Sequence, residues 1–476
     1  MATLRLGAIA DALGGELALG GNPPAGGAEH EVEGYSIDSR SVKRGDLFFA
    51  LVGPRHDGHR FVGAALAGGA TAAIVGRDSG PFPDAPALIR VPDTTRALQD
   101  LGAHVRRTRP LKVVGITGSA GKTTAKEMTA AVMGERYRAY RNEGNLNNTY
   151  GLPLSLLRMP DDREAVVLEM GMSYHGELTR LVEIGDPDVG VILNVLPVHI
   201  EHFGRLEKIA EAKGELFRTM REDAVAVYNA DDPSTAKLGR AFSGRSIPYG
   251  VTSSSARIGA DAFTMEGLEG SRFTLRVGKE TVPARIGIPG RHNLYNALAA
   301  AATGHALGIG AEAIARAIGS VRPAAMRGVL HRLQDGIRLL DDSYNSNPAA
   351  MERVIEILVE SQPRGRRVLV SGDMLELGSH GRKAHTRLGE QVAEAGIDLF
   401  IAVGPLSGRA AAAARGGRAI EVHHFADSAA AADFVPSALR SADLIIVKGS
   451  RGIAMEHVVR AVIASFPPDD AAGGQR

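Results

Sequence analysis

The run Gly-Ile-Thr-Gly-Ser-Ala-Gly-Lys-Thr-Thr at residues 115–124 constrains the fold of this chain more than any other feature. It follows apolar residues and precedes a helix-like stretch that extends to about Met133. A strand, a glycine-rich turn and a helix start form a phosphate-binding loop, whose backbone N–H groups point at phosphate oxygens. The general pattern requires glycine where Ile116 stands. The alternative interpretation is a glycine-rich turn that carries a surface lysine.

The residue types in this loop predict that the chain binds a nucleoside triphosphate. The amine of Lys122 can reach the β- and γ-phosphates, and the hydroxyl of Thr123 can bind Mg²⁺. The predicted nucleotide-binding loop comprises Thr117, Gly118, Ser119, Ala120, Gly121, Lys122, Thr123 and Thr124.

Composition limits the other classes of function. The chain has 55 Lys and Arg against 54 Asp and Glu, so a net charge of +1 gives no electrostatic case for nucleic acid or a membrane surface. The absence of cysteine excludes disulfides, thiolate metal sites and a cysteine nucleophile. The sequence has no signal-peptide pattern and no run of about 18 apolar residues, so we expect a soluble cytoplasmic protein.

The chain is too long for one hydrophobic core, and its 476 residues predict about three domains. Two polar breaks that end in proline, at Pro110 and Pro323, divide the sequence. We therefore predict domains over residues 1–109, 110–322 and 323–476.

Alternating strand and helix patterns predict that all three domains are of the α/β class with mostly parallel sheets. Residues 273–277 and 282–286 alternate instead like antiparallel strands. The last domain is predicted to be Rossmann-like, but it lacks a Gly-x-Gly-x-x-Gly fingerprint. The other strand predictions are 46–51, 72–75, 165–168, 189–195, 224–228, 337–340, 367–370, 399–403 and 444–447; the main helix predictions are 61–67, 123–133, 207–220, 348–359 and 384–395.

Polar side chains follow the predicted strands of the central domain. Glu169 ends an apolar strand, and at the carboxyl edge of a parallel sheet it can hold Mg²⁺ beside the phosphate loop; the alternative is an ordinary strand-ending glutamate. His199 follows the next strand and falls at the same edge. Lys213 lies in the helical stretch 207–220, where the sequence alone favours a solvated helix lysine.

Three further residues are candidates for nucleotide recognition. Asn293 and Asn296 lie three positions apart near the start of a helix, and therefore on one face. Their amides can bind an adenine edge, although Asn293 can alternatively cap the helix. Asp342 follows the first strand of the last domain and is placed to face a ligand.

Taken together, these segments resemble the Mur ligase family over nearly the whole chain. The family's loop, Gly-x-x-Gly-x-x-Gly-Lys-Thr-Thr, accounts for Ile116. The last domain is similar to the branch that adds D-alanyl-D-alanine, and the run Asp-Asn-Pro-Arg expected of the diaminopimelate-adding branch is missing. The segments that carry the resemblance are 38–40, 45–51, 57–59, 115–124, 145–148, 169–171, 290–293, 341–345, 372–378 and 447–451.

The resemblance implies an ATP-dependent ligase of peptidoglycan precursor synthesis. Such an enzyme joins D-alanyl-D-alanine to the terminal carboxylate of UDP-N-acetylmuramoyl-tripeptide through an acyl phosphate, and its cofactors are ATP and Mg²⁺. It implies a UDP-substrate-binding first domain, a central ATP-binding domain and a C-terminal Rossmann-like ligase domain that closes on it. We further expect a monomer whose partners are these small molecules.

The resemblance also assigns roles to individual residues. Lys213 is implied to be carbamylated and to hold a second Mg²⁺ with His199, while Thr123 and Glu169 hold the first. Arg327 is implied to lie near the γ-phosphate and Asp342 at the ribose. The implied adenine site is Asn293 and Asn296, and the implied substrate-binding residues are Ser39, Arg40, Asn147 and Asn148.

Two other interpretations remain open at this point. Within the ligases, the chain could belong to the diaminopimelate- or lysine-adding member, which amine selectivity would reveal. Outside them, it could be an ATP-hydrolysing motor or switch. Such a protein releases phosphate without a carboxylate acceptor, whereas a ligase requires both co-substrates.

Overall fold

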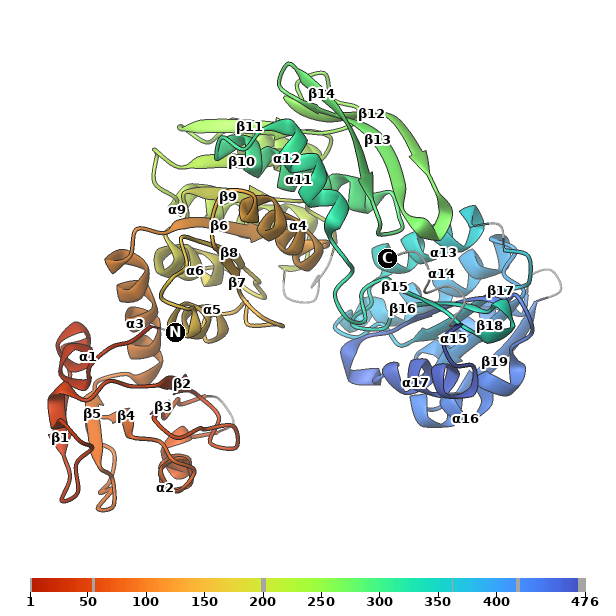
Figure 1. Cartoon of the computed structure of the whole chain (residues 1–476). Coiled ribbons are helices and arrows are strands. Elements are labelled where there is room, and N and C mark those ends of the chain that lie inside the picture. The colour runs from red at the N-terminus through yellow and green to blue at the C-terminus, as the bar shows by residue number, and fades with distance from the viewer. Residues whose placement is uncertain (1, 54–55, 198–202, 362, 417–419, 470–476) are drawn as a thin grey trace.

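The computed structural model describes residues 2–53, 56–197, 203–361, 363–416 and 420–469, and these residues form three sheets. The sheets and their helices follow one another along an arc (Figure 1). The predicted α/β class is confirmed. We propose that the three units have the predicted limits 1–109, 110–322 and 323–476, because each range contains one complete sheet.

The first sheet has five strands in the order β1-β5-β4-β3-β2, and all neighbours are parallel except β1 and β5. Its strands are β1 (Glu16–Leu19), β2 (Gly34–Ser36), β3 (Asp46–Phe49), β4 (Ala72–Gly76) and β5 (Ala87–Val91); its helices are α1 (Leu6–Leu13), α2 (Val62–Ala67) and α3 (Thr94–Thr108).

The central sheet has nine strands in the order β14-β13-β12-β11-β10-β9-β6-β8-β7. Strands β6 to β11 pair in parallel, whereas β12, β13 and β14 pair antiparallel. This confirms that residues 273–277 and 282–286 are antiparallel strands. The strands are β6 (Lys112–Thr117), β7 (Ala139–Arg141), β8 (Ala165–Glu169), β9 (Val189–Ile192), β10 (Val225–Asn229), β11 (Arg245–Tyr249), β12 (Ile258–Met265), β13 (Ser271–Val277) and β14 (Glu280–Ile286).

Helices cover both faces of the central sheet, and two separate apolar cores lie beneath them. Helices α4 and α11 pack together over one face, which brings the start of α11 near the phosphate loop (Figure 1). The helices of this domain are α4 (Lys122–Gly134), α5 (Gly151–Arg158), α6 (Glu177–Gly185), α8 (Leu206–Lys213), α9 (Glu215–Thr219), α10 (Pro233–Arg240), α11 (His292–Ala306) and α12 (Ala311–Ser320).

The third sheet has the order β15-β16-β20-β17-β18-β19 and is parallel except for β15. Its strands are β15 (Val329–Arg332), β16 (Arg338–Asp342), β17 (Arg367–Gly372), β18 (Leu399–Val403), β19 (Glu421–Phe425) and β20 (Leu444–Lys448); its helices are α13 (Pro348–Glu360), α14 (Gly381–Glu394), α15 (Ser407–Ala414), α16 (Ser428–Ala438) and α17 (Glu456–Ser465).

The tip of the β12–β13 hairpin reaches across to the third sheet (Figure 1). Its turn carries Leu268, which is buried within the core of the C-terminal domain beside Leu340 and Met351. The adjacent Glu269 forms an ion pair with Arg332 of β15. The C-terminal domain is therefore attached to the central domain at this tip as well as through the connecting chain.

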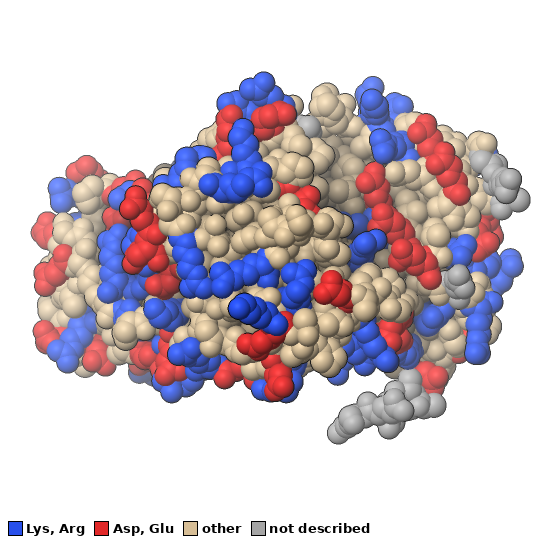
Figure 2. Space-filling view, turned by 90° about the horizontal axis from the view of Figure 1, so that it is seen from above, with Lys and Arg blue, Asp and Glu red and all other residues tan. Residues whose placement is uncertain are grey.

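Charge is mixed over the surface. Figure 2 shows basic and acidic side chains interspersed on the face that it presents. Among the described residues, no helix combines the length and the apolar character that crossing a membrane requires.

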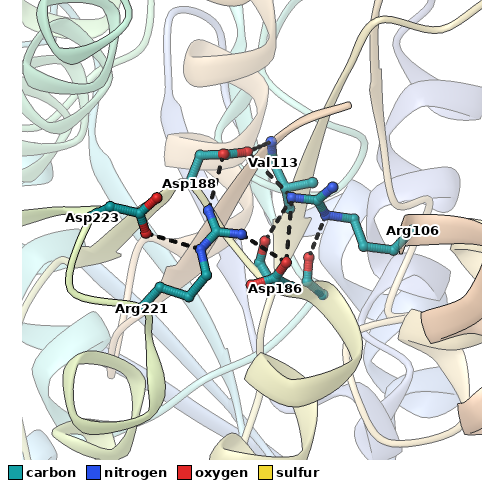
Figure 3. Close-up of polar contacts among 7 residues, drawn as sticks. Arg106, Val113, Asp186, Asp188, Arg221 and Asp223 are labelled. Carbon is teal, nitrogen blue, oxygen red and sulfur yellow. Dashed lines mark hydrogen bonds and ion pairs between the residues drawn. The ribbon is translucent and has the colours of Figure 1, made fainter. Parts of the chain in front are cut away.

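An ion-pair cluster joins α3 to the central sheet (Figure 3). The Arg106 guanidinium donates to the backbone oxygens of Gly185 and Asp186 at 3.1 and 2.9 Å, and it lies 3.4 Å from the carboxylate of Asp188. Asp188 also accepts from the backbone N–H of Val113 at 2.8 Å, where β6 begins. The cluster therefore holds α3 against the strand that leads to the phosphate loop.

We expect Arg106→Leu to lower the free energy of unfolding by about 2–4 kcal/mol, because two backbone carbonyl oxygens lose their donor and the Asp188 carboxylate loses a buried cation. Arg221 is the matched control: it pairs with the same two aspartates, but its side chain is 42% exposed, against 8% for Arg106. Arg221→Leu should cost less than about 1 kcal/mol. Chemical denaturation of both variants checks this, and equal losses would contradict the ranking.

Candidate functional site

The phosphate loop has the geometry that the sequence predicts. Strand β6 ends at Thr117 and α4 begins at Lys122, so the helix N-terminus faces the loop. Gly121 precedes the helix with a φ of 84°, a conformation that L side chains rarely adopt. At Gly118 a β-carbon would lie 2.9 Å from Cβ of Leu193. Both glycines are required for the loop to close.

Lys122 and Thr123 start the helix in polar surroundings. The Lys122 amine donates to the backbone oxygen of Gly118 at 2.9 Å, which curls the side chain back over the loop. Burial lowers its pKa, Glu169 partly opposes this, and the positive charge of Arg327 lowers it further. The hydroxyl of Thr123 donates to a carboxylate oxygen of Glu169 at 2.8 Å. The first turn of α4 thus meets the carboxyl edge of β8.

Glu169 has the chemistry of a magnesium ligand. The residue is 4% exposed, and its second carboxylate oxygen accepts from the side-chain amide of Asn147 at 2.8 Å. One carboxylate and one hydroxyl are the protein ligands that Mg²⁺ usually takes when phosphates supply further oxygens. No group of three His, Asp or Glu side chains that could bind a metal occurs within the described residues. The Thr123–Glu169 pair therefore fits a nucleotide-bound ion, not an all-protein cage.

Lys213 is buried, so the solvated helix lysine that the sequence alone favours is wrong. The predicted helix 207–220 is two helices that meet at Gly214, and Lys213 is the last residue of α8. Its residue exposure is 3%. Burial holds its pKa well below the usual range, and the charge of Lys122 lowers it further. His199, its implied partner, lies outside the described residues.

The C-terminal domain supplies a second set of charged groups. The amine of Lys448 at the end of β20 lies 2.5 Å from the carboxylate of Asp342 at the end of β16. Arg327 lies in the chain between the domains, with its guanidinium carbon 4.0 Å from the ring centre of Tyr344.

Both sets line one cavity of about 270 Å³, which we call the phosphate-loop cavity. The structure therefore brings predicted residues from two domains to a single cavity. The cavity is lined by residues 119–124, 144, 145, 147, 169, 288, 289, 292, 293, 296, 327, 328, 340, 342, 344, 345, 347, 350, 353, 354, 357 and 448.

The two predicted asparagines lie on one wall of this cavity. The side-chain amide of Asn296 donates to the side-chain oxygen of Asn293 at 3.0 Å, and that of Asn293 donates to the backbone oxygen of Pro289 at 2.7 Å. Arg291 occupies the N-cap position of α11, so the alternative that Asn293 caps the helix is wrong.

Four titratable residues of the lining were not predicted as site residues: His292, Tyr344, Arg353 and Lys448. Burial lowers the pKa of His292 to about 3, with Arg353 and Lys448 adding to the effect, so its imidazole is neutral. The segments 290–293, 341–345 and 447–451, which carry the resemblance, contain three of the four. Membership in these segments is the sequence signal that could have identified those three residues.

The predicted substrate-binding residues are dispersed. Asn148 lines a second cavity of about 540 Å³ between the first and central domains, together with Leu51, His56 and Tyr150. Its side-chain oxygen also accepts from the N–H of Gly151, where α5 begins.

The other three lie elsewhere. Asn147 lines the phosphate-loop cavity. Arg40 is exposed and pairs with Asp38 at 2.7 Å, and Ser39 is half-buried beside it. Neither Ser39 nor Arg40 lines either cavity.

A phosphate loop that faces a second α/β domain across one cavity defines a multidomain nucleotide-binding enzyme. Three family models match the chain: the Mur ligase family catalytic domain over residues 31–135, the Mur ligase middle domain over 116–304 and the Mur ligase glutamate ligase domain over 326–451. The chain belongs to the Mur ligase family.

Named relatives and solved structures agree with this. A UDP-N-acetylmuramoyl-tripeptide–D-alanyl-D-alanine ligase of Escherichia coli is 36% identical over 97% of this chain and 99% of its own. The enzyme of that name from Bacillus subtilis is 35% identical over 91% of this chain and 94% of its own. A crystal structure of MurF from Acinetobacter baumannii has a TM-score of 0.86 at 29% identity, and the match covers 98% of this chain and 99% of that protein. MurF from Thermotoga maritima, solved with ADP, has a TM-score of 0.79 at 28% identity, and the match covers 91% of this chain and 97% of that protein.

Proposed function

We propose that this enzyme joins D-alanyl-D-alanine to the terminal carboxylate of UDP-N-acetylmuramoyl-tripeptide in an ATP-dependent step of peptidoglycan precursor synthesis. One observation carries the proposal: a single cavity holds the phosphate loop of one domain and the Asp342–Lys448 pair of another. The full-length relatives named for this reaction support the assignment of substrates.

ATP is required because a free carboxylate does not react with an amine at neutral pH, where its leaving group would be oxide. Transfer of the γ-phosphoryl group to the tripeptide carboxylate gives an acyl phosphate and ADP. The dipeptide amine attacks the acyl carbon, loses a proton, and expels phosphate from a tetrahedral intermediate. Positioning and charge neutralisation provide most of the catalysis of such phosphoryl transfer.

The residues of the cavity divide these tasks. Lys122 and the loop N–H groups bind the β- and γ-phosphates, and Arg327 approaches the γ-phosphate from the opposite wall. Thr123 and Glu169 would hold Mg²⁺, which when bound neutralises phosphate charge. The loop from Thr117 to Thr124 wraps the phosphates, as its backbone geometry supports.

Lys213 completes this part of the site as a carbamate. Burial lowers the pKa of the Lys213 amine and so favours its neutral form, which is the form that adds carbon dioxide. The carbamate presents carboxylate-like oxygens, which suit Mg²⁺, whereas a bare ammonium would repel it. For His199 as the second ligand, the proposal rests on the resemblance alone.

The remaining residues bind the two nucleotides. Asn293 and Asn296 offer amide groups to adenine, and Asp342, held by Lys448, accepts from the ribose hydroxyls. We assign the UDP substrate to the first domain, with Ser39, Arg40, Asn147 and Asn148 along its path to the phosphate loop. As the resemblance implies, we further propose that the enzyme is a monomer and that it acts in the cytoplasm.

The test is ADP and phosphate release with tripeptide substrates that end in diaminopimelate, lysine or ornithine. We expect release to require both a tripeptide and D-alanyl-D-alanine, and one tripeptide to be preferred. Free diaminopimelate or lysine should not replace the dipeptide. Equal release without a carboxylate acceptor would contradict the proposal and favour an ATP-hydrolysing switch.

A further inference from the structure

Arg327 is held by an aromatic ring. Its guanidinium carbon lies 4.0 Å from the centre of the Tyr344 ring, within the range of a cation–π interaction. This contact is with an aromatic ring rather than with a carboxylate. Both side chains line the phosphate-loop cavity. The ring therefore restrains a cation that keeps its full charge.

The backbone fixes the two side chains to each other. The N–H of Tyr344 donates to the oxygen of Met326 at 3.1 Å, and the N–H of Gly328 donates to the oxygen of Asp341 at 2.8 Å. Met326 and Gly328 have φ values of 63° and 77°, so the chain turns on both sides of Arg327. The arginine and the ring consequently move as one unit with the C-terminal domain.

A ring and a carboxylate would hold the arginine with different consequences. A carboxylate would neutralise the guanidinium and occupy the N–H groups that phosphate needs. An aromatic face attracts the cation through its quadrupole and leaves the N–H groups at the guanidinium edge available. We propose that Tyr344 is a positioning residue that holds the Arg327 guanidinium in the cavity, ready to bind the transferred phosphoryl group. The proposal rests on the proposed function.

The test compares kcat for Tyr344→Leu and Tyr344→Phe at saturating co-substrates. Loss of the ring should lower kcat by about fivefold to tenfold, in the range that a cation–π contact provides. Tyr344→Phe keeps the ring and should stay within about twofold of wild type, and KM for the UDP substrate should not change in either variant. Should the leucine variant unfold, Tyr344→Gln replaces it at this half-buried, cavity-facing position.

A double-mutant cycle separates positioning from a merely structural role. In an Arg327→Ala background, Tyr344→Leu should cost less than about a further twofold, because the ring then has no guanidinium to hold. An equal cost in both backgrounds, or a phenylalanine variant as slow as the leucine variant, would overturn the proposal. Wild-type activity that does not require both co-substrates would instead overturn the proposed function, and the same cycle would then be measured on ATP hydrolysis.

Discussion

Lys122→Ala is expected to lower the rate of ligation by at least about a hundredfold, the usual scale for removing a group that stabilises transition-state charge. The amine spans the loop to the oxygen of Gly118 and lies where the β- and γ-phosphates would bind. Its role is to meet phosphate charge and not to pack, so thermal unfolding of the variant should stay close to that of wild type. Steady-state kinetics and thermal unfolding check the two halves of this prediction.

Two controls make the result specific. Lys112→Ala removes an exposed lysine at the start of β6, the strand that leads to the phosphate loop, and should leave kcat unchanged. Lys122→Ala should also bind the UDP substrate as wild type does, because the second cavity lies between the first and central domains. Near-normal turnover would contradict the placement of Lys122, and loss of UDP-substrate binding would contradict the separation of the two sites.

Lys213→Ala is expected to remove most activity, because the second Mg²⁺ would lack an oxygen ligand. Lys208 lies on the same helix, its side chain is 42% exposed, and it pairs with Glu211 at 2.6 Å, so it is the matched control. Lys208→Ala should change stability by less than about 0.5 kcal/mol and leave activity unchanged. Full activity in Lys213→Ala would exclude the carbamate.

Added formate or acetate tests the chemical identity of the missing ligand. A small carboxylate can occupy the space that the alanine variant leaves and supply the oxygens of the carbamate, so turnover should partly return. The same anions should not raise the activity of wild type or of Lys122→Ala. Mass spectrometry of the intact wild-type protein under mild conditions should find the added mass of carbon dioxide, and Lys213→Ala should lack it.

The sequence predicted the elements whose local pattern is strong. The glycines and Lys122 identify the phosphate loop without any tertiary information, and the apolar runs of the central strands identify β8, β17, β18 and β20. Strands β2, β5, β11 and β12 were not predicted. Neither were four short strands, β1, β7, β15 and β19. Each lies at the edge of a sheet and is only partly buried, so it lacks a continuous apolar run.

Side-chain environment was harder to predict than secondary structure. Lys213 has the local pattern of a surface helix residue, and only its tertiary surroundings bury it. The predicted single helix is divided at Gly214, where a β-carbon would lie 2.7 Å from Leu238 of α10, and the local sequence pattern reveals neither feature. Lys448 and Tyr344 belong to segments that the sequence singles out. That Lys448 pairs with Asp342, and Tyr344 with Arg327, is apparent only in the fold.

The docking of Leu268 limits how the C-terminal domain can move. A body held at one flexible point can rotate in any direction, whereas a body held at two points can rotate only about the line that joins them. The connecting chain before β15 is one such point, and the hairpin tip with Leu268 and the Glu269–Arg332 pair is the other. While both hold, we expect the domain to turn about the line between them, which carries Asp342 along an arc relative to the phosphate loop and leaves Arg327, in the connecting chain, close to the axis. A nucleotide bound at the phosphate loop would then be approached by Asp342 along a single path.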